Sequence, residues 1–205
     1  MIRLMTIRPA ATIVVVRESP AAGFEVLVLR RSRQSRFAPG FVVFPGGVVE
    51  RNDEALAAAW FGSPAEAARA CALRELAEET GLVMTSAGLV EAPGELPGDP
   101  GLPSPGLEDV REMARWVAPE FLPVRFDARF FALAAAPGLT PRPDGVEIEH
   151  AWWDSPGAVL ERYDGVDVAL MWPTLKTMEA LARCRSVDEV LSLRVDQVSP
   201  PGAAE

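Results

Sequence analysis

The chain has 205 residues, of which 49% are hydrophobic and 24% charged, and its formal net charge is −9. This composition is typical of a soluble globular protein, and the length suits one core better than two independent domains. The negative charge argues against binding to a nucleic-acid backbone, and no apolar run approaches the ~20 residues of a membrane helix. We therefore expect a cytoplasmic protein without nucleic-acid or membrane partners.

The cysteines and the histidine exclude several kinds of metal site. Cys71 and Cys184 have neither a metal-ligand spacing nor a disulfide framework, and His150 is the only histidine. Zinc sites built from cysteine or histidine are therefore excluded. If the substrate is anionic, a divalent cation is the obvious group to neutralise acidic side chains near it.

The first third of the chain predicts a hairpin followed by a short strand. Residues 10–16 and 24–29 are apolar, β-branched runs separated by a turn that contains proline and glycine. Such runs are typical of paired strands. A further strand is expected at 41–44, where Pro45-Gly46-Gly47 stops it.

Two helices are expected next. Either Asn52 or Asp53 can cap a short helix that extends to Phe61 and ends at Gly62. The sequence Ser63-Pro64-Ala65-Glu66 then places serine at the N-cap, proline at the first helical position and glutamate at the third, which is a capping box.

This second helix is the best-defined element of the chain. It extends to Thr80, after which Gly81 supplies the left-handed residue that commonly ends a helix and Leu82 the following apolar contact.

The remaining sequence alternates strands and helices. Nine of the fifteen residues at 92–106 are proline or glycine, which indicates a surface loop. We expect strands at 82–90, 130–134 and 146–153, and helices at 107–116, 156–163, 173–184 and 187–195. We therefore predict one α/β or α+β domain over 1–198, with an insertion at 48–62, and a disordered tail at 199–205.

Three glutamates share one face of the helix that follows Ser63. Glu75, Glu78 and Glu79 stand at i, i+3 and i+4, a spacing at which like charges repel. Crowded carboxylates suit Mg²⁺ or Mn²⁺, because these hard cations prefer oxygen ligands. Arg74 can pair with Glu78 one turn later and so position it. Taken alone, the three glutamates are better explained by a solvated acidic helix end.

The wider pattern resembles the Nudix box, G-x5-E-x7-R-E-U-x-E-E-x-G-U, where U is a bulky aliphatic residue. Glu66 lies eight residues before Arg74, and every specified position from Glu66 to Leu82 matches. The leading glycine departs from the pattern. Gly47 lies 19 positions before Glu66 where the box has 6, so thirteen extra residues, including the short helix, separate the loop from the box helix.

The resemblance implies a Nudix fold, a mixed-sheet α/β/α sandwich with the box as loop, helix and loop. It implies Mg²⁺- or Mn²⁺-dependent attack by water on a pyrophosphate, with the metal lowering the pKa of that water. By carry-over, Glu75, Glu78 and Glu79 are the metal ligands, joined by the Gly46 carbonyl. Arg74 orients Glu75, and Arg74, Glu75 and Glu78 count among the catalytic residues.

A fourth carboxylate is expected from the strand at 146–153. Nudix enzymes often add a base or an extra metal ligand from this region. Glu147 is placed six residues before Trp153, in keeping with that feature, so it is our candidate in preference to Glu149. An exposed strand face explains both glutamates equally well.

The sequence upstream of the box resembles the accessory signature of coenzyme A diphosphatases. Arg31-Ser32, Arg36, Gly40 and Phe44-Pro45-Gly46-Gly47 match that signature from its arginine onward. Arg31 and Arg36 are therefore candidate substrate-binding residues, since guanidinium groups grip phosphates by paired hydrogen bonds. Further stretches resemble a long-insert Nudix branch that includes coenzyme A diphosphatases: 36–40, 125–131 and 172–175.

Other functions stay open at this point. ADP-ribose pyrophosphatases share a proline about fifteen positions past the box, where Pro97 lies, so a nucleotide-sugar substrate is one alternative. A catalytically silent domain that senses a nucleotide is another, although no box carboxylate is missing. A small-molecule nucleotide is the expected partner in each case, and a homodimer is left open.

Overall fold

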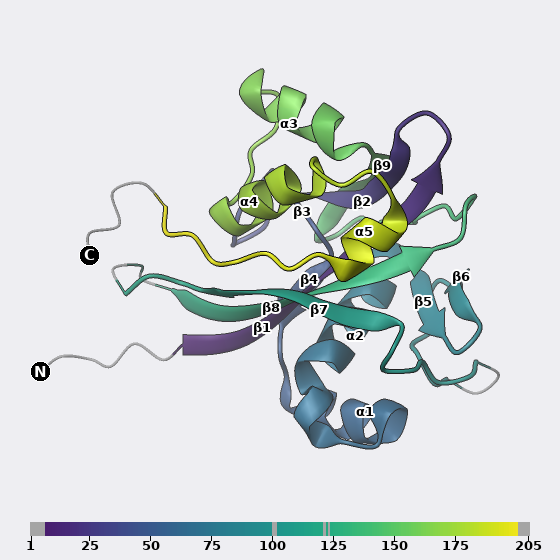
Figure 1. The fold of residues 1–205 in the computed structure, drawn as a ribbon. Coiled ribbons are helices and arrows are strands. Elements are labelled where there is room, and N and C mark those ends of the chain that lie inside the picture. Colours follow the sequence, from purple (N-terminus) through teal and green to yellow (C-terminus); the bar gives the residue numbers. More distant parts are fainter. Residues whose placement is uncertain (1–6, 100–101, 121, 123, 201–205) are drawn as a thin grey trace, which may run out of the picture.

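The computed structural model describes residues 7–99, 102–120, 122 and 124–200. A seven-stranded mixed sheet lies at its centre, with helices on both faces (Figure 1). The strands of this sheet are β1 (Ile7–Ser19), β2 (Gly23–Arg31), β3 (Val42–Val43), β4 (Gly46–Val48), β7 (Val110–Val117), β8 (Arg125–Ala135) and β9 (Ile148–Asp154).

The sheet branches around its first two strands. Its path is β3-β2-β1-β8-β7, with β4 paired to β1 and β9 paired to β2. The β1–β8 pair is parallel and the other pairs are antiparallel, so the sheet is mixed. A separate hairpin pairs β5 (Leu82–Thr85) with β6 (Gly88–Glu91).

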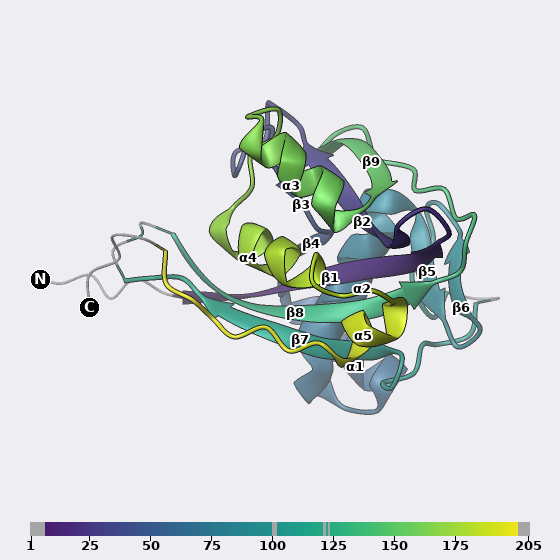
Figure 2. The same ribbon diagram turned by 45° about the horizontal axis from the view of Figure 1, so that its top comes forward.

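Helices cover both faces of the sheet. On one face lie α1 (Arg51–Phe61), the short 3₁₀ turn η1 (Pro64–Glu66) and α2 (Ala67–Thr80). On the other lie α3 (Pro156–Asp164), α4 (Trp172–Leu181) and α5 (Val187–Ser192) (Figure 2). The predicted α/β/α sandwich with a mixed sheet is therefore confirmed. None of the helices in the described ranges is both long and apolar enough to cross a membrane.

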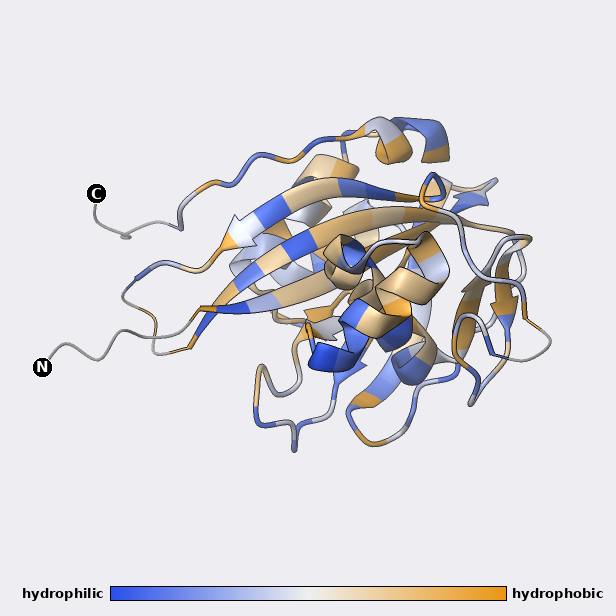
Figure 3. Cartoon of the chain, turned by 90° about the horizontal axis from the view of Figure 1, so that it is seen from below, coloured by the Kyte–Doolittle hydropathy of each residue, from blue (hydrophilic) through white to orange (hydrophobic). Residues whose placement is uncertain are grey.

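The sheet separates two apolar cores, and β1 contributes to both. Ile13 and Val15 pack with α1 and α2, whereas Val14 and Val16 pack with the helices of the opposite face. Successive side chains of a strand point to opposite faces, so a strand covered on both sides is apolar throughout. In the view from below, the middle of the long strands is largely hydrophobic, and hydrophilic bands interrupt these strands mainly toward their left ends (Figure 3).

The box helix α2 ends as its sequence predicts, but it begins at Ala67, because Ser63 caps the 3₁₀ turn η1 that precedes it. The Ser63 hydroxyl accepts a hydrogen bond from the Ala65 amide, and Gly81 closes the helix in the left-handed region at φ 65°. The short helix α1 begins earlier than expected, because Glu50 is its N-cap. Asp53, predicted as a possible cap, instead occupies the first turn, where its carboxylate accepts the Glu50 amide at 2.8 Å.

The helix predicted at 107–116 is wrong, because this segment forms the edge strand β7. Val110, Met113 and Ala114 stand at i, i+3 and i+4, which imitates a helical stripe. The spacing arises from a bulge between Glu112 and Ala114 that interrupts the two-residue period of the strand. Val110 consequently faces the α2 side, while Met113 and Ala114 face the other core.

Several element ends also differ from the sequence-based expectation. Pro45-Gly46-Gly47 was expected to end a strand, but Gly46 and Gly47 begin β4. The segment expected to form one strand at 82–90 forms the β5–β6 hairpin instead. The last helix ends at Ser192, after which the Val195 amide donates to the Met113 carbonyl on the edge of β7. No helix or strand occurs in the described part of the 92–106 loop, and most of the predicted tail, 201–205, lies outside the described residues.

Candidate active site

The Gly46–Gly47 turn meets α2 directly. Gly46 pairs with Thr12 of β1, and its amide donates to the Glu79 carboxylate at 3.0 Å. A Cβ atom on Gly47 would meet the Glu75 carboxylate, so a side chain at this position would displace that carboxylate. The predicted meeting of the loop and the box helix is therefore present in spite of the extra residues between them.

Arg74 is the centre of the carboxylate cluster. Its guanidinium donates to the Glu75 carboxylate at 2.8 Å and to the Glu78 carboxylate at 2.9 Å. It also forms a two-pronged ion pair with Asp53, with nitrogen–oxygen distances of 2.8 and 3.1 Å. The Asp53 side chain is fully buried, and Arg74 is nearly so. Arg74 thus contacts three carboxylates, those of Asp53, Glu75 and Glu78.

Asp53 is the site residue that the sequence interpretation missed. It lies in α1, within the extra segment, and was considered only as a helix cap. Counted from Gly47, Asp53 has the spacing that the box gives to its first glutamate. Counting back from Arg74 assigns Glu66 to that position instead, but Glu66 pairs with Arg69 at 3.0 Å. Counting forward from Gly47 would have identified Asp53 and placed the extra residues after it.

Glu147 and Arg31 form the opposite wall of the site. The Arg31 guanidinium lies 3.4 Å from the Glu147 carboxylate and 3.9 Å from the Glu79 carboxylate. Asp144 fixes the backbone before β9 by accepting the Glu147 and Ile148 amides. Arg31 is therefore engaged by carboxylates, although the sequence suggested that it binds substrate.

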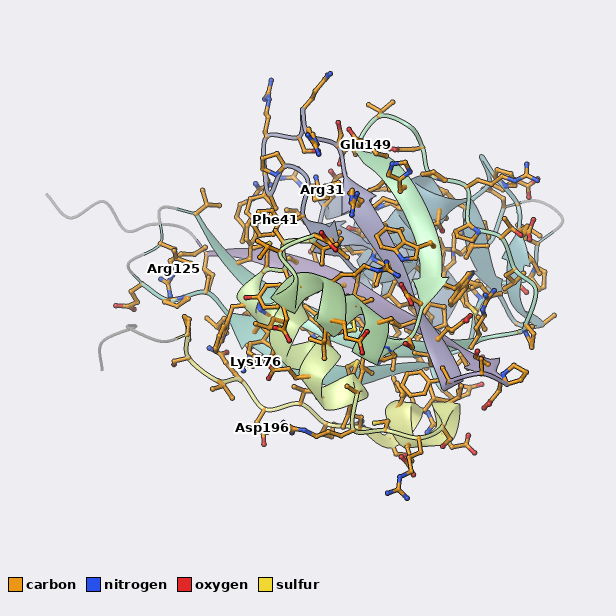
Figure 4. All side chains as sticks on the ribbon, turned by 90° about the horizontal axis from the view of Figure 1, so that it is seen from above. Arg31, Phe41, Arg125, Glu149, Lys176 and Asp196 are labelled. Atoms are coloured by element: carbon orange, nitrogen blue, oxygen red, sulfur yellow. The ribbon has the colours of Figure 1, made fainter. Side chains whose placement is uncertain are left out.

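The other residues expected near Arg31 are arranged differently. Arg36 is exposed and makes no hydrogen bond or ion pair within the described residues, so its guanidinium is available to an anion. Glu149 accepts the Arg33 amide at 3.2 Å rather than an arginine side chain. Figure 4 shows Arg31 at the base of this loop and Glu149 on the neighbouring strand. The structure thus brings Glu147, and not Glu149, to the box carboxylates.

Burial changes the protonation of the cluster. It raises the pKa of the Glu79 carboxyl well above its ordinary value, and the nearby Glu75 charge adds to this effect against the Gly46 amide and Arg31. Burial likewise raises the pKa of Glu75, opposed by Arg74. Burial would lower the pKa of Arg74, but its hydrogen bonds to the Asp53 carboxylate and the charge of Glu75 raise this pKa overall. Arg74 therefore stays charged.

The chemistry of the cluster suits a hard divalent cation. Two guanidiniums, Arg31 and Arg74, face five carboxylates, those of Asp53, Glu75, Glu78, Glu79 and Glu147. This excess of negative charge and of oxygen donors is what Mg²⁺ or Mn²⁺ neutralises.

The carboxylates do not yet converge on one point. Within the described ranges, no group of three or more His, Cys, Asp or Glu side chains is arranged to hold a metal ion. Glu75 and Glu78 face Arg74, whereas Glu79 faces the Gly46 amide, and no contact brings the Gly46 carbonyl to them. The Glu78 side chain is 48% exposed, so it has the freedom to turn from Arg74 toward a cation.

A separate groove of about 680 Å³ lies along the outer edge of β7. Its lining includes Arg69, Arg111 and Arg194 and none of the predicted site residues. The carboxylate cluster, rather than this groove, is therefore the candidate active site.

Comparison with known proteins agrees with this geometry. The NUDIX domain model matches residues 6–167. The acyl-coenzyme A diphosphatase NUDT19 of Homo sapiens is 26% identical over 255 aligned residues, which cover 89% of this chain and 67% of the human protein.

Solved structures show the same likeness. A NUDIX hydrolase from Alicyclobacillus acidocaldarius is 31% identical with a TM-score of 0.78, covering 94% of this chain and 99% of that one. The NUDIX domain of Shewanella oneidensis NrtR, complexed with ADP ribose, has a TM-score of 0.57 at 14% identity over 88% of both chains, which is a likeness of fold.

The Asp53–Arg74 pair predicts a large effect for Asp53→Asn. This change keeps the shape of the side chain but leaves the buried guanidinium without its two-pronged partner, so the free energy of unfolding should fall by about 3 kcal/mol. Urea unfolding measures this loss. Glu54→Gln, one residue along on the exposed side of α1, is the matched control and should change little. Equal stability of the two variants would contradict the role of Asp53.

The raised pKa of Glu79 predicts a pH-dependent effect of Glu79→Gln in cation-free protein. A carboxyl whose pKa is higher in the folded state stabilises the fold below its unfolded pKa of about 4.3, and this contribution is lost as pH rises through the folded value. At pH 8 the Glu79→Gln variant should therefore have a higher melting temperature than the unchanged protein. The expected difference is about 2–4 °C for each kcal/mol of destabilisation that the substitution removes.

The same comparison at pH 5.5 supplies the control. There the wild-type carboxyl takes up its proton more readily, so the gap between the two melting temperatures should narrow. Thermal melts in the presence of a chelator measure both gaps. A gap that is identical at the two pH values, or a variant that melts lower at pH 8, would show that burial does not perturb Glu79.

Proposed function

The chain belongs to the Nudix family and is a pyrophosphohydrolase, and from this premise we propose that it cleaves the diphosphate of coenzyme A or an acyl-CoA with Mg²⁺ or Mn²⁺. Nudix hydrolases generally need a divalent metal and act on small-molecule nucleotide substrates. The observation that carries the catalytic part of the proposal is the set of carboxylates organised by Arg74 beside Gly46 and Gly47.

The substrate proposal rests on the loop before the site. Arg31-Ser32, Arg36, Gly40 and the Phe44–Gly47 segment follow the coenzyme A diphosphatase signature, and the human relative is named as an acyl-coenzyme A diphosphatase. Arg36 supports the proposal, because its exposed guanidinium has no partner in the described part of the chain and can pair with a phosphate of the substrate.

The proposed division of labour follows from the contacts. Glu75, Glu78 and Glu79 would hold the cation, with the Gly46 carbonyl beside them. Arg74 orients Glu75 and Glu78, and Asp53 fixes Arg74 from the opposite side. The cation supplies charge neutralisation for the diphosphate and a bound water of lowered pKa.

Glu147 is the proposed base. Its carboxylate is 64% exposed and faces the site across Arg31, so it can accept a proton from the attacking water. The water attacks phosphorus, the bond to the bridging oxygen breaks, and two phosphate monoesters leave.

A panel of diphosphates tests this function. With Mg²⁺ or Mn²⁺, coenzyme A should yield 3′,5′-ADP and 4′-phosphopantetheine, identified by mass, at a higher kcat/KM than ADP-ribose, NADH or dinucleoside polyphosphates. The Arg36 contact and the signature residues are the reason for this order. Preferential release of AMP from ADP-ribose would replace the substrate proposal with the nucleotide-sugar alternative, and no turnover of any diphosphate would favour a silent, nucleotide-sensing domain.

Glu78→Gln is the control within the same panel. The side chain is half exposed and interacts only through its carboxylate in the described ranges, so the variant should keep its melting temperature. It should nevertheless lose at least about 100-fold in kcat, because it lacks a charged ligand. Near-normal turnover of this variant would refute the proposed role of Glu78.

A further inference from the structure

An exposed aromatic ring stands beside the carboxylate cluster. Phe37, in the loop that joins β2 to β3, is 44% exposed. Its ring packs edge-on against Phe126 of β8, with ring centroids 5.4 Å apart and an interplanar angle of 72°. Phe126 is itself only partly buried. Among the residues that the structure describes, the two rings therefore form an apolar surface that is open to water on its Phe37 side.

The loop holds Phe37 outward in a strained conformation. The next residue, Ala38, has φ 46°, which a residue with a Cβ atom rarely adopts. The Ala38 carbonyl accepts the Phe41 amide at 3.2 Å and so closes a tight turn through Pro39 and Gly40. Strain of this kind persists where the surrounding structure enforces it, and it is concentrated at ligand-binding sites. The surrounding structure therefore enforces a strained backbone at Ala38, next to an apolar ring that is exposed to water.

Arg31 connects the ring to the catalytic groups. Its guanidinium donates to the Phe37 carbonyl at 3.1 Å, and the same group faces Glu147 and Glu79. The exposed Arg36 directly precedes Phe37. Phe37 is therefore joined through its backbone carbonyl to the arginine that contacts the carboxylate cluster, and its neighbour Arg36 offers an exposed guanidinium for a phosphate. Figure 4 shows Arg31 beside Phe41 where the loop returns to the sheet.

We propose that Phe37, supported from behind by Phe126, is the surface on which the nucleobase of the diphosphate substrate stacks. The inference rests on the proposed function, since it assumes that the phosphates lie at the carboxylate cluster. An aromatic ring can stack on the face of any nucleobase, whichever hydrogen-bond donors and acceptors the edge of that base carries. The Phe126 ring fixes the tilt of Phe37, so the stacking face is already oriented before a ligand arrives.

The test compares two probes that differ only in the base. Binding of AMP and of ribose 5-phosphate to the full chain with Mg²⁺ is measured by calorimetry. Phe37→Ala should weaken AMP binding about 5- to 100-fold and leave ribose 5-phosphate unchanged. Phe37→Trp should restore AMP binding, because it returns an aromatic face, whereas Phe37→Leu should not. Restoration by tryptophan separates a stacking role from a role in folding the loop.

Leu107→Ala provides the matched control. Leu107 is similarly exposed, at 40%, and lines the separate groove at β7. This variant should bind both probes as the unchanged protein does. Equal weakening of AMP and ribose 5-phosphate by Phe37→Ala, or no weakening of either, would overturn the inference. So would tryptophan and leucine variants that behave alike.

The outcome is separable from that of the proposed function. A protein that prefers AMP to ribose 5-phosphate through Phe37 but hydrolyses no diphosphate would retain the stacking surface and lose the enzymatic proposal. A protein that hydrolyses diphosphates with the same AMP affinity in the Phe37→Ala variant would retain the enzyme and lose the stacking surface. In an active enzyme, Phe37→Ala should also raise KM about 5-fold or more with little change in kcat.

Discussion

The buried ion pair between Arg74 and Asp53 is the constraint on which the site depends. A guanidinium this close to full burial requires charged partners, and Asp53 supplies both of its oxygens from a different helix. With Arg74 fixed in this way, its remaining nitrogen donates to Glu75, the next residue, and to Glu78, one turn further along α2. The pair therefore joins α1 to α2 and sets the directions of two proposed metal ligands at once.

The second constraint is an unbalanced charge that the protein alone does not neutralise. Arg31 lies between Glu79 and Glu147. Arg74 contacts Asp53, Glu75 and Glu78. Each guanidinium is therefore shared by more than one carboxylate. Burial and the neighbouring carboxylates accordingly raise the pKa of the Glu79 carboxyl. A divalent cation would neutralise this excess negative charge. In the proposed function, the rest of the nucleotide would extend toward the exposed loop around Arg36 and Phe37.

Sequence patterns predicted those parts of the molecule whose causes are local. The serine cap at Ser63, the glycine that ends α2 and the helical spacing of the box glutamates depend on neighbouring residues alone, so they could be predicted directly. The edge strand β7 could not, because a bulge at Glu112 gave it a helical spacing. The ion pairs of Asp53 and Arg31 could not be predicted for a different reason. Their partners lie on α2 and before β9, and neither segment alone indicates a pairing across the fold.

The most direct test of the account is a calorimetric titration of the full chain with Mn²⁺ in two buffers of different ionisation enthalpy. Binding of Mn²⁺ should release a proton, because the raised pKa of Glu79 favours a protonated carboxyl and the cation displaces that proton. Binding should disappear when Glu75, Glu78 and Glu79 are all changed to glutamine. An absence of Mn²⁺ binding, or binding that survives the triple change, would contradict the claim that the carboxylates organised by Arg74 form the metal site.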